Sequence, residues 1–145
     1  MVSYILTVGL FLVVKHWVAD ALAQTPYQYK NKGNWRHPGG YVHAAVHTIG
    51  TAFAITAGVG GPVDAVSIWL VFSLAIFDGS IHYIVDYLKV NLNKPEWSRV
   101  GTDRDGRPCL CVYSDTYFYA LIADQCAHFA TYIIILYILV GAASS

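Results

Sequence analysis

Histidine and aspartate side chains recur at intervals of four residues in four separate apolar stretches of the sequence. These side chains are His16 and Asp20 in the first stretch, His43 and His47 in the second, Asp78, His82 and Asp86 in the third, and Asp124 and His128 in the fourth. A step of four residues places side chains on one face of a helix, one turn apart. Each stretch therefore presents a single polar stripe on an otherwise apolar helix.

Imidazole and carboxylate groups together form binding sites for zinc, manganese or iron. Helical bundles build such sites from facing helices, commonly with a histidine one turn from a carboxylate. Because the inventory exceeds one tetrahedral site, we predict one or two divalent metal ions. The predicted ligands are His16, Asp20, His43, His47, His82, Asp86, Asp124 and His128. Asp78 is predicted to act as a base or to orient a ligand, and Gln24 and Gln125 to hydrogen-bond to ligands.

The helices that carry these stripes have the composition of a membrane protein. Of 145 residues, 56% are hydrophobic and only 12% are charged. A soluble domain usually carries about 25% charged residues. The formal net charge is zero, which excludes a global electrostatic field for nucleic acid. We predict an all-α fold that resides in a lipid bilayer and binds no nucleic acid.

The apolar stretches predict a single transmembrane domain, an integral membrane four-helix bundle. The predicted helices cover residues 2–23, 41–59, 63–90 and 112–140. Each is close to the roughly 20 residues that a helix needs to cross the hydrocarbon core, and backbone groups in lipid must be satisfied within the segment. Residues 91–111 are predicted to form a basic cytoplasmic loop or hairpin, with turn residues from Asp103 to Pro108.

Basic residues divide the connections into two sides. Lys30, Lys32 and Arg36 precede the second helix, and Arg99 lies in the basic loop before the fourth. The positive-inside rule therefore places both of these loops in the cytoplasm and both termini outside. The polar stripes then meet in the cytoplasmic half of the bundle. There these four basic side chains are predicted to bind an anionic head group or phosphate.

The ordered set of polar motifs resembles the domain of unknown function 3307, a family of bacterial and phage membrane proteins. The motifs are His16-Trp17-Val18-Ala19-Asp20 with Gln24-Thr25, then His43 and His47, then His82 with Asp86-Tyr87-Leu88-Lys89, and Asp124-Gln125-Cys126-Ala127-His128. The resemblance spans nearly the whole chain and implies a multi-pass protein of the bacterial inner membrane with a polar, metal-type centre. A looser likeness to membrane-bound metal-dependent hydrolases implies hydrolysis but names no substrate.

The leading hypothesis is a metal-dependent hydrolase that acts at the cytoplasmic side on a lipid or phosphorylated substrate. One alternative is a proton- or ion-handling protein, since Asp and His chains also relay protons. The other is a non-enzymatic scaffold, in which the polar groups serve as hydrogen-bonding contacts between helices. Small residues in the second helix would also permit close packing across an oligomer.

Overall fold

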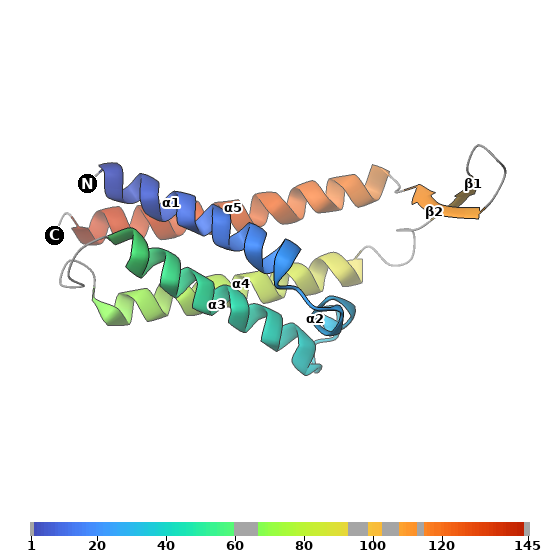
Figure 1. The fold of residues 1–145 in the computed structure, drawn as a ribbon, viewed down its shortest axis with the longest axis horizontal. Coiled ribbons are helices and arrows are strands. Elements are labelled where there is room, and N and C mark those ends of the chain that lie inside the picture. Colours follow the sequence, from blue (N-terminus) through green and yellow to red (C-terminus); the bar gives the residue numbers. More distant parts are fainter. Residues whose placement is uncertain (1, 60–66, 93–98, 103–107, 113–114, 144–145) are drawn as a thin grey trace.

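The computed structural model of the protein describes residues 2–59, 67–92, 99–102, 108–112 and 115–143. Four long helices and one short helix make up most of the described chain, with a pair of short strands before the last helix (Figure 1). The elements in order are α1 (Val2–Trp17), η1 (Val18–Leu22), α2 (Pro26–Asn31), α3 (Pro38–Val59), α4 (Ile68–Leu92), β1 (Arg99–Thr102), β2 (Pro108–Val112) and α5 (Asp115–Ala143). The expected helical class is confirmed.

Within the described residues, three helices are long and apolar enough to cross a membrane. These spans are Ser3–Leu22, Ile68–Leu92 and Phe118–Ala143. The predicted second span, residues 41–59, lies within α3, which has 22 residues but is not one of the three. The predicted start of the third helix near Val63 lies outside the described residues.

The long helices lie side by side, and both chain ends lie at the same end of the molecule (Figure 1). α3 contacts both α1 and α4, and α5 contacts the same two helices. A close approach between α3 and α4 depends on Gly79, because a Cβ at that position would meet the side chain of Thr48 and the carbonyl of Ala44. This approach brings the histidines of α3 next to His82 of α4.

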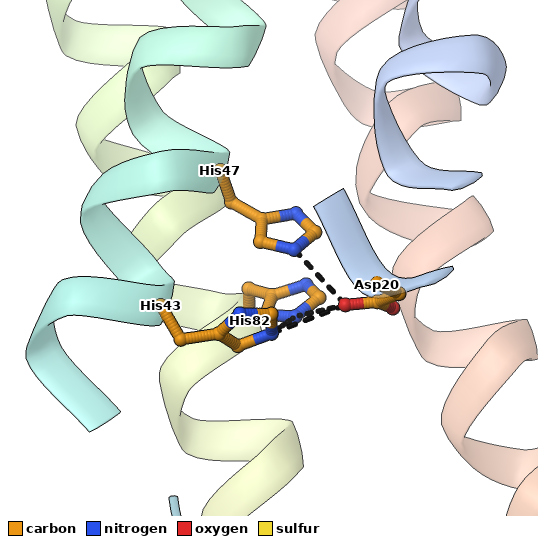
Figure 2. Close-up of side chains that lie close together, drawn as sticks. All are labelled: Asp20, His43, His47 and His82. Carbon is orange, nitrogen blue, oxygen red and sulfur yellow. Dashed lines mark hydrogen bonds and ion pairs between the residues drawn. The ribbon is translucent and has the colours of Figure 1, made fainter. Parts of the chain in front are cut away.

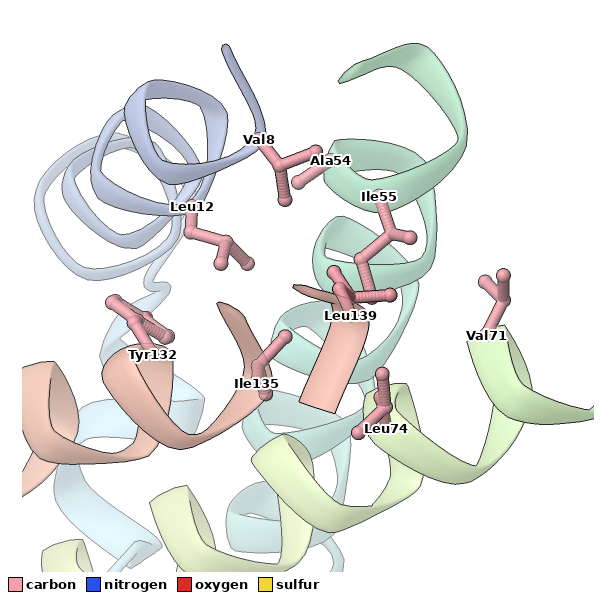
Figure 3. Close-up of a cluster of buried hydrophobic side chains, with 9 residues drawn as sticks. All are labelled: Val8, Leu12, Ala54, Ile55, Val71, Leu74, Tyr132, Ile135 and Leu139. Carbon is pink, nitrogen blue, oxygen red and sulfur yellow. The ribbon is translucent and has the colours of Figure 1, made fainter. Parts of the chain in front are cut away.

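A buried apolar cluster fills the end of the bundle near the termini (Figure 3). Its members come from all four long helices: Val8, Leu12, Ala54, Ile55, Val71, Leu74, Tyr132, Ile135 and Leu139. Along each helix these residues lie nearer to the termini than most of the polar stripe does. The bundle therefore has an apolar half and a polar half.

The polar half is covered by α2 and by the residues that follow it. Thr25 caps α2: its Oγ1 accepts a hydrogen bond from the backbone N–H of Gln28, and Oε1 of Gln28 accepts one from the N–H of Thr25. This reciprocal arrangement is a capping box. Further along, Nδ2 of Asn91 on α4 donates to the carbonyl of Gly33 over 2.8 Å. Together these contacts hold the segment against α4.

The segment expected to be a loop or hairpin contains the two strands, which pair antiparallel. Thr102 lies opposite Pro108, and Arg99 lies opposite Val112. The hairpin extends beyond the start of α5, at the end of the molecule far from the termini (Figure 1). The turn predicted at Asp103–Pro108 lies, apart from Pro108, outside the described residues.

Candidate metal centre

Asp20 lies on η1, a stretch of π-helix that continues α1. The N–H of Ala23 donates to the carbonyl of Val18 over 2.8 Å, five residues back. Such π-helical turns are rare and often occur at functional sites. The wider turn changes the direction of the side chains that follow α1, and Asp20 points toward α3 and α4 (Figure 2). Sequence spacing alone predicted a regular helix here.

Three histidine rings converge on this carboxylate (Figure 2). Oδ1 of Asp20 lies 3.1 Å from Nε2 of His43, 3.1 Å from Nε2 of His47 and 3.6 Å from Nε2 of His82. Nε2 of His43 lies 3.1 Å from Nε2 of His82. One ligand atom from each of these four residues lies within 4.8 Å of all the others. Three separate elements thus direct an N₃O donor set at one point.

The separations around Oδ1 of Asp20 are compatible with a tetrahedral divalent ion. Metal–nitrogen distances of about 2.0–2.1 Å place neighbouring ligand atoms about 3.3 Å apart. The separations from Oδ1 of Asp20 to the three imidazole nitrogens are 3.1, 3.1 and 3.6 Å. The donors present therefore fit a cation. Ligation of a metal through Nε2 of His43 would replace the contacts of that atom with Nε2 of Gln24 and Nε2 of His82, both at 3.1 Å.

A second donor group shares His82 with the first. Its members are His82, Asp86 and His128, all of them buried. Nδ1 of His82, Oδ2 of Asp86 and Nε2 of His128 are buried and make no hydrogen bond with the described residues. Buried polar atoms are normally paired, so this group also fits a cation. One ion, or two ions with His82 between them, are both compatible with the arrangement.

His16 is used differently from the other histidines of the polar half. Its Nε2 lies 3.2 Å from Oε1 of Gln125 and 3.3 Å from Oδ2 of Asp20, and both of these oxygens are acceptors. Nε2 therefore carries the ring proton, and Nδ1 accepts from the hydroxyl of Tyr132 at 3.0 Å. With both nitrogens engaged, His16 holds Asp20 in place and belongs to neither donor group. The prediction of His16 as a direct ligand remains a prediction.

Asp124 also lies beside the donor groups and belongs to neither. Its Oδ2 accepts from Nζ of Lys89 over 2.7 Å and from Nε2 of Gln125 over 3.1 Å. Its Oδ1 lies 3.5 Å from Nε2 of His128. Asp124 thus orients His128, while Gln125 links it to His16. Gln24 lies 3.1 Å from Nε2 of His43, and Gln125 lies 3.2 Å from Nε2 of His16. That both glutamines hydrogen-bond to metal ligands remains a prediction.

Lysine ammonium groups pair with three of the four buried or half-buried carboxylates. The pairs are Lys15 with Asp78 at 2.5 Å, Lys32 with Asp86 at 2.9 Å and Lys89 with Asp124 at 2.7 Å. Within the described chain, no lysine or arginine pairs with Asp20. Four carboxylates therefore face three ammonium groups, which leaves an excess of one negative charge when the imidazoles are neutral. A divalent ion beside Asp20 would change the net charge of the site from one negative to one positive charge.

Asp78 lies on the side of the site nearest the apolar core. Its Oδ2 accepts hydrogen bonds from Nζ of Lys15 over 2.5 Å and from Oγ1 of Thr51 over 2.6 Å. Nζ of Lys15 also lies 3.3 Å from Nδ1 of His47. Asp78 thus acts on the donor group through Lys15 and His47. Of the two roles predicted for Asp78, these contacts favour orientation over direct proton transfer.

The same contact sets a condition on His47. When Lys15 donates to Nδ1, the ring proton stays on Nε2 and is donated to Asp20. Ligation of a metal through Nε2 requires the proton to move to Nδ1, which breaks the contact with Lys15. No such contact affects the ring of His82, whose Nδ1 is unpaired within the described chain.

The four residues predicted to bind an anion lie in different environments. Lys30 and Arg36 are exposed, whereas Lys32 is buried against Asp86. Its ammonium group thus already has a carboxylate partner, and the predicted anion would have to compete with Asp86. Arg99 begins β1.

Sequence reasoning missed two residues that support the site. Thr51, which binds Asp78, follows His47 by four residues, and Tyr132, which binds His16, follows His128 by four. Both continue the same four-residue stripe, so the signal was present. It was overlooked because a hydroxyl in an apolar helix usually bonds to its own backbone.

Comparison with known proteins gives one match. A family model described as a protein of unknown function, DUF3307, matches residues 8–145. Comparison with curated proteins and with solved structures finds no match. The matched range includes every residue of both donor groups.

Proposed function

Because the chain belongs to the DUF3307 family, whose description names no activity, the function must be argued from the site, and we propose a membrane metal-dependent hydrolase. The substrate is a lipid or another phosphorylated compound. The observation that carries the proposal is the convergence of Asp20, His43, His47 and His82 within 4.8 Å. Polar groups in membrane helices are costly and usually mark a functional site.

The proposed topology places all four long helices across the bilayer, with α3 as the fourth span. The segment from α2 to Arg36 and the hairpin then face the cytoplasm, and both termini lie on the other side. α3 carries two histidines whose cost in lipid is offset by their contacts with Asp20 and Asp86. Its position between α1 and α4 supports this assignment, since both neighbours are apolar enough to span.

The chemistry follows from the donor set. A bound divalent ion would polarise a phosphoryl oxygen and lower the pKa of a water to about 7. Asp20 and His82 would hold the ion, and His16 would fix the carboxylate of Asp20 through its Nε2–H. Lys15 and Lys89 would hold the neighbouring carboxylates in their ionised form by direct ion pairs.

The first test is elemental analysis of protein purified in detergent without chelator. Near-stoichiometric zinc, manganese or iron is expected in the wild type and should be lost in His82→Gln, because His82 belongs to both donor groups. His37→Gln is the matched control, since His37 caps the start of α3 by accepting from the N–H of Gly39 and belongs to neither group. Equal metal content in both variants would refute the assignment.

Hydrolysis is tested separately. Phosphate release from an anionic phospholipid in mixed micelles should require both the metal and His82. The alternative outcome is a protein that binds metal stoichiometrically and yet releases no phosphate from phospholipids or soluble phosphate esters. That result would support the metal centre and refute the proposed hydrolysis.

The chain of polar contacts also supports a second candidate, proton handling within the polar half. His16 links Tyr132 to Gln125, and Gln125 continues to Asp124 and Lys89. Transfer across the whole membrane is disfavoured, because the buried apolar cluster closes the half of the bundle near the termini. Proton flux into proteoliposomes that contain the purified protein would favour this candidate over hydrolysis.

A further inference from the structure

The donor groups are enclosed on most sides, and Asp20 is the exception. The side chain of Asp20 is 29% exposed, whereas those of the other donors are at most 4% exposed. A cavity of about 270 Å³ opens beside it between α1, η1 and α5. The cavity is lined by His16, Trp17, Asp20, Ala21 and Gln125. Any ligand that reaches the site through this cavity meets Asp20 first.

The end of the polar half away from the termini is covered by α2 and the segment after it. Gln28 and Lys32 are buried there, and Lys32 reaches Asp86. The hydroxyl of Tyr83 donates to the carbonyl of Trp35 over 2.7 Å, which anchors the segment to α4. Within the described residues, the route to Asp20 is therefore lateral, between helices.

The lateral opening continues into an apolar groove. This groove has a volume of about 470 Å³ and shares Trp17 and Ala21 with the polar cavity. Its remaining wall consists of Val13, Val14, Val18 and Leu22. α1 and η1 form the span Ser3–Leu22, so Asp20 lies near one end of that span while Val13 and Val14 lie deeper. The wall is therefore polar near the end of the span and apolar deeper in. A lipid has the same order, with a polar head group followed by apolar chains.

Trp17 lies where the polar cavity meets the apolar groove, and it is 70% exposed. Tryptophan is enriched where the head groups meet the hydrocarbon of a bilayer. The position of Trp17 therefore matches the depth at which the head of a lipid joins its chains.

We propose that the metal centre takes a lipid with an anionic head group directly from the membrane, through the opening between η1 and α5. The head group enters the cavity beside Asp20, and an acyl chain lies along Val13, Val14 and Val18. The preference for an anion follows from charge, because a divalent ion turns the excess of one carboxylate into an excess of one positive charge. The inference rests on the proposed function because it requires the metal ion. The groove and the cavity are present in the structure whether or not a metal binds.

A photolabelling experiment tests this route. The protein is placed in phosphatidylcholine nanodiscs that contain a small fraction of phosphatidic acid with a diazirine in its acyl chain. Labelling should concentrate on residues 13–22. Excess unlabelled phosphatidic acid should reduce it at least fivefold, and neither inorganic phosphate nor additional phosphatidylcholine should do so. Labelling spread evenly over the lipid-facing helices, or reduced equally by phosphatidylcholine, would overturn the proposal.

Two matched variants locate the entrance. Ala21→Trp fills the wall shared by the cavity and the groove, and Ala123→Trp fills a separate groove between α4 and α5 lined by Lys89 and Asp124. Both alanines are exposed. Ala21→Trp should lower specific labelling at least fivefold, and Ala123→Trp should leave it within twofold. The reverse result would overturn the proposed entrance.

Metal content measured on the same samples separates the two proposals. Specific labelling of a protein without metal would contradict both the proposed hydrolysis and the charge argument for an anionic head group, and would support only the groove as a lipid site. Stoichiometric metal together with even labelling would refute the proposed lipid site and support the metal centre.

Discussion

The ion pair between Lys32 and Asp86 makes a quantitative prediction. Nζ of Lys32 lies 2.9 Å from Oδ1 of Asp86, and the two side chains are only 9% and 4% exposed. Removing one partner of a buried ion pair costs about 3–5 kcal/mol, because the other charge remains buried without compensation. Lys32→Met should therefore lower the free energy of unfolding of the metal-free protein by about that amount.

Lys30→Met is the control, since Lys30 lies in the last turn of α2, two residues before Lys32, and is exposed. A surface substitution of this kind changes stability by about 0.5 kcal/mol or less. Both variants are unfolded in mixed detergent micelles with chelator present, and the transition is followed by circular dichroism. Equal stability of the two variants would refute the description of Asp86 as a buried charge neutralised by Lys32.

The same variants test whether Asp86 binds metal. Its Oδ2 faces Nε2 of His43 at 3.3 Å and Nε2 of His82 at 3.4 Å. Zinc at one hundred times its dissociation constant stabilises a protein by about 2.7 kcal/mol. Zinc should stabilise Lys32→Met more than the wild type at the same concentration, because the carboxylate then lacks its ammonium partner. Equal stabilisation of the wild type and Lys32→Met by zinc would show that Asp86 is not a metal ligand.

Three further predictions concern the donor group and the helices that carry it. Asp20→Asn should lower zinc affinity by more than the roughly 10–100-fold that loss of an outer hydrogen-bonding partner costs; titration against a competing chelator measures this, and an unchanged affinity would exclude Asp20. Zinc affinity should fall as the pH is lowered, because metal ligation requires neutral imidazoles and ionised carboxylates; equal affinities at acidic and neutral pH would contradict histidine ligation. Gly79→Ala should cost about 1–3 kcal/mol of stability through overpacking against Thr48, whereas Gly141→Ala, with open space around it, should be neutral; similar unfolding transitions for the two would disprove the tight contact.

The family and the helical class followed from the sequence because both depend on local patterns. Apolar runs of about 20 residues and polar residues four apart are visible without any knowledge of how helices pack. Three of the predicted spans agree with helices that are long and apolar enough to cross a membrane. The span predicted at residues 41–59 is a helix, α3, that is not among the three candidate spans found in the described residues.

The lysines show which contacts local patterns do not reveal. The basic loop predicts that Lys32 binds an anion, and the structure adds a partner that the loop does not reveal, the buried carboxylate of Asp86. For Lys15 the sequence offered no fixed partner, and the structure pairs it with Asp78, 63 residues away. Such pairings depend on which helices are neighbours, and periodicity within one helix carries no information on that.

The sequence by itself determined which side chains share a helical face, because the spacing of residues along a helix sets their direction. Only the tertiary structure decided which of these side chains meet. The π-helical turn aims Asp20 at His43, His47 and His82, while the hydroxyl of Tyr132 engages His16. That difference arises from the rotation of each helix about its own axis, which packing against the neighbouring helices sets.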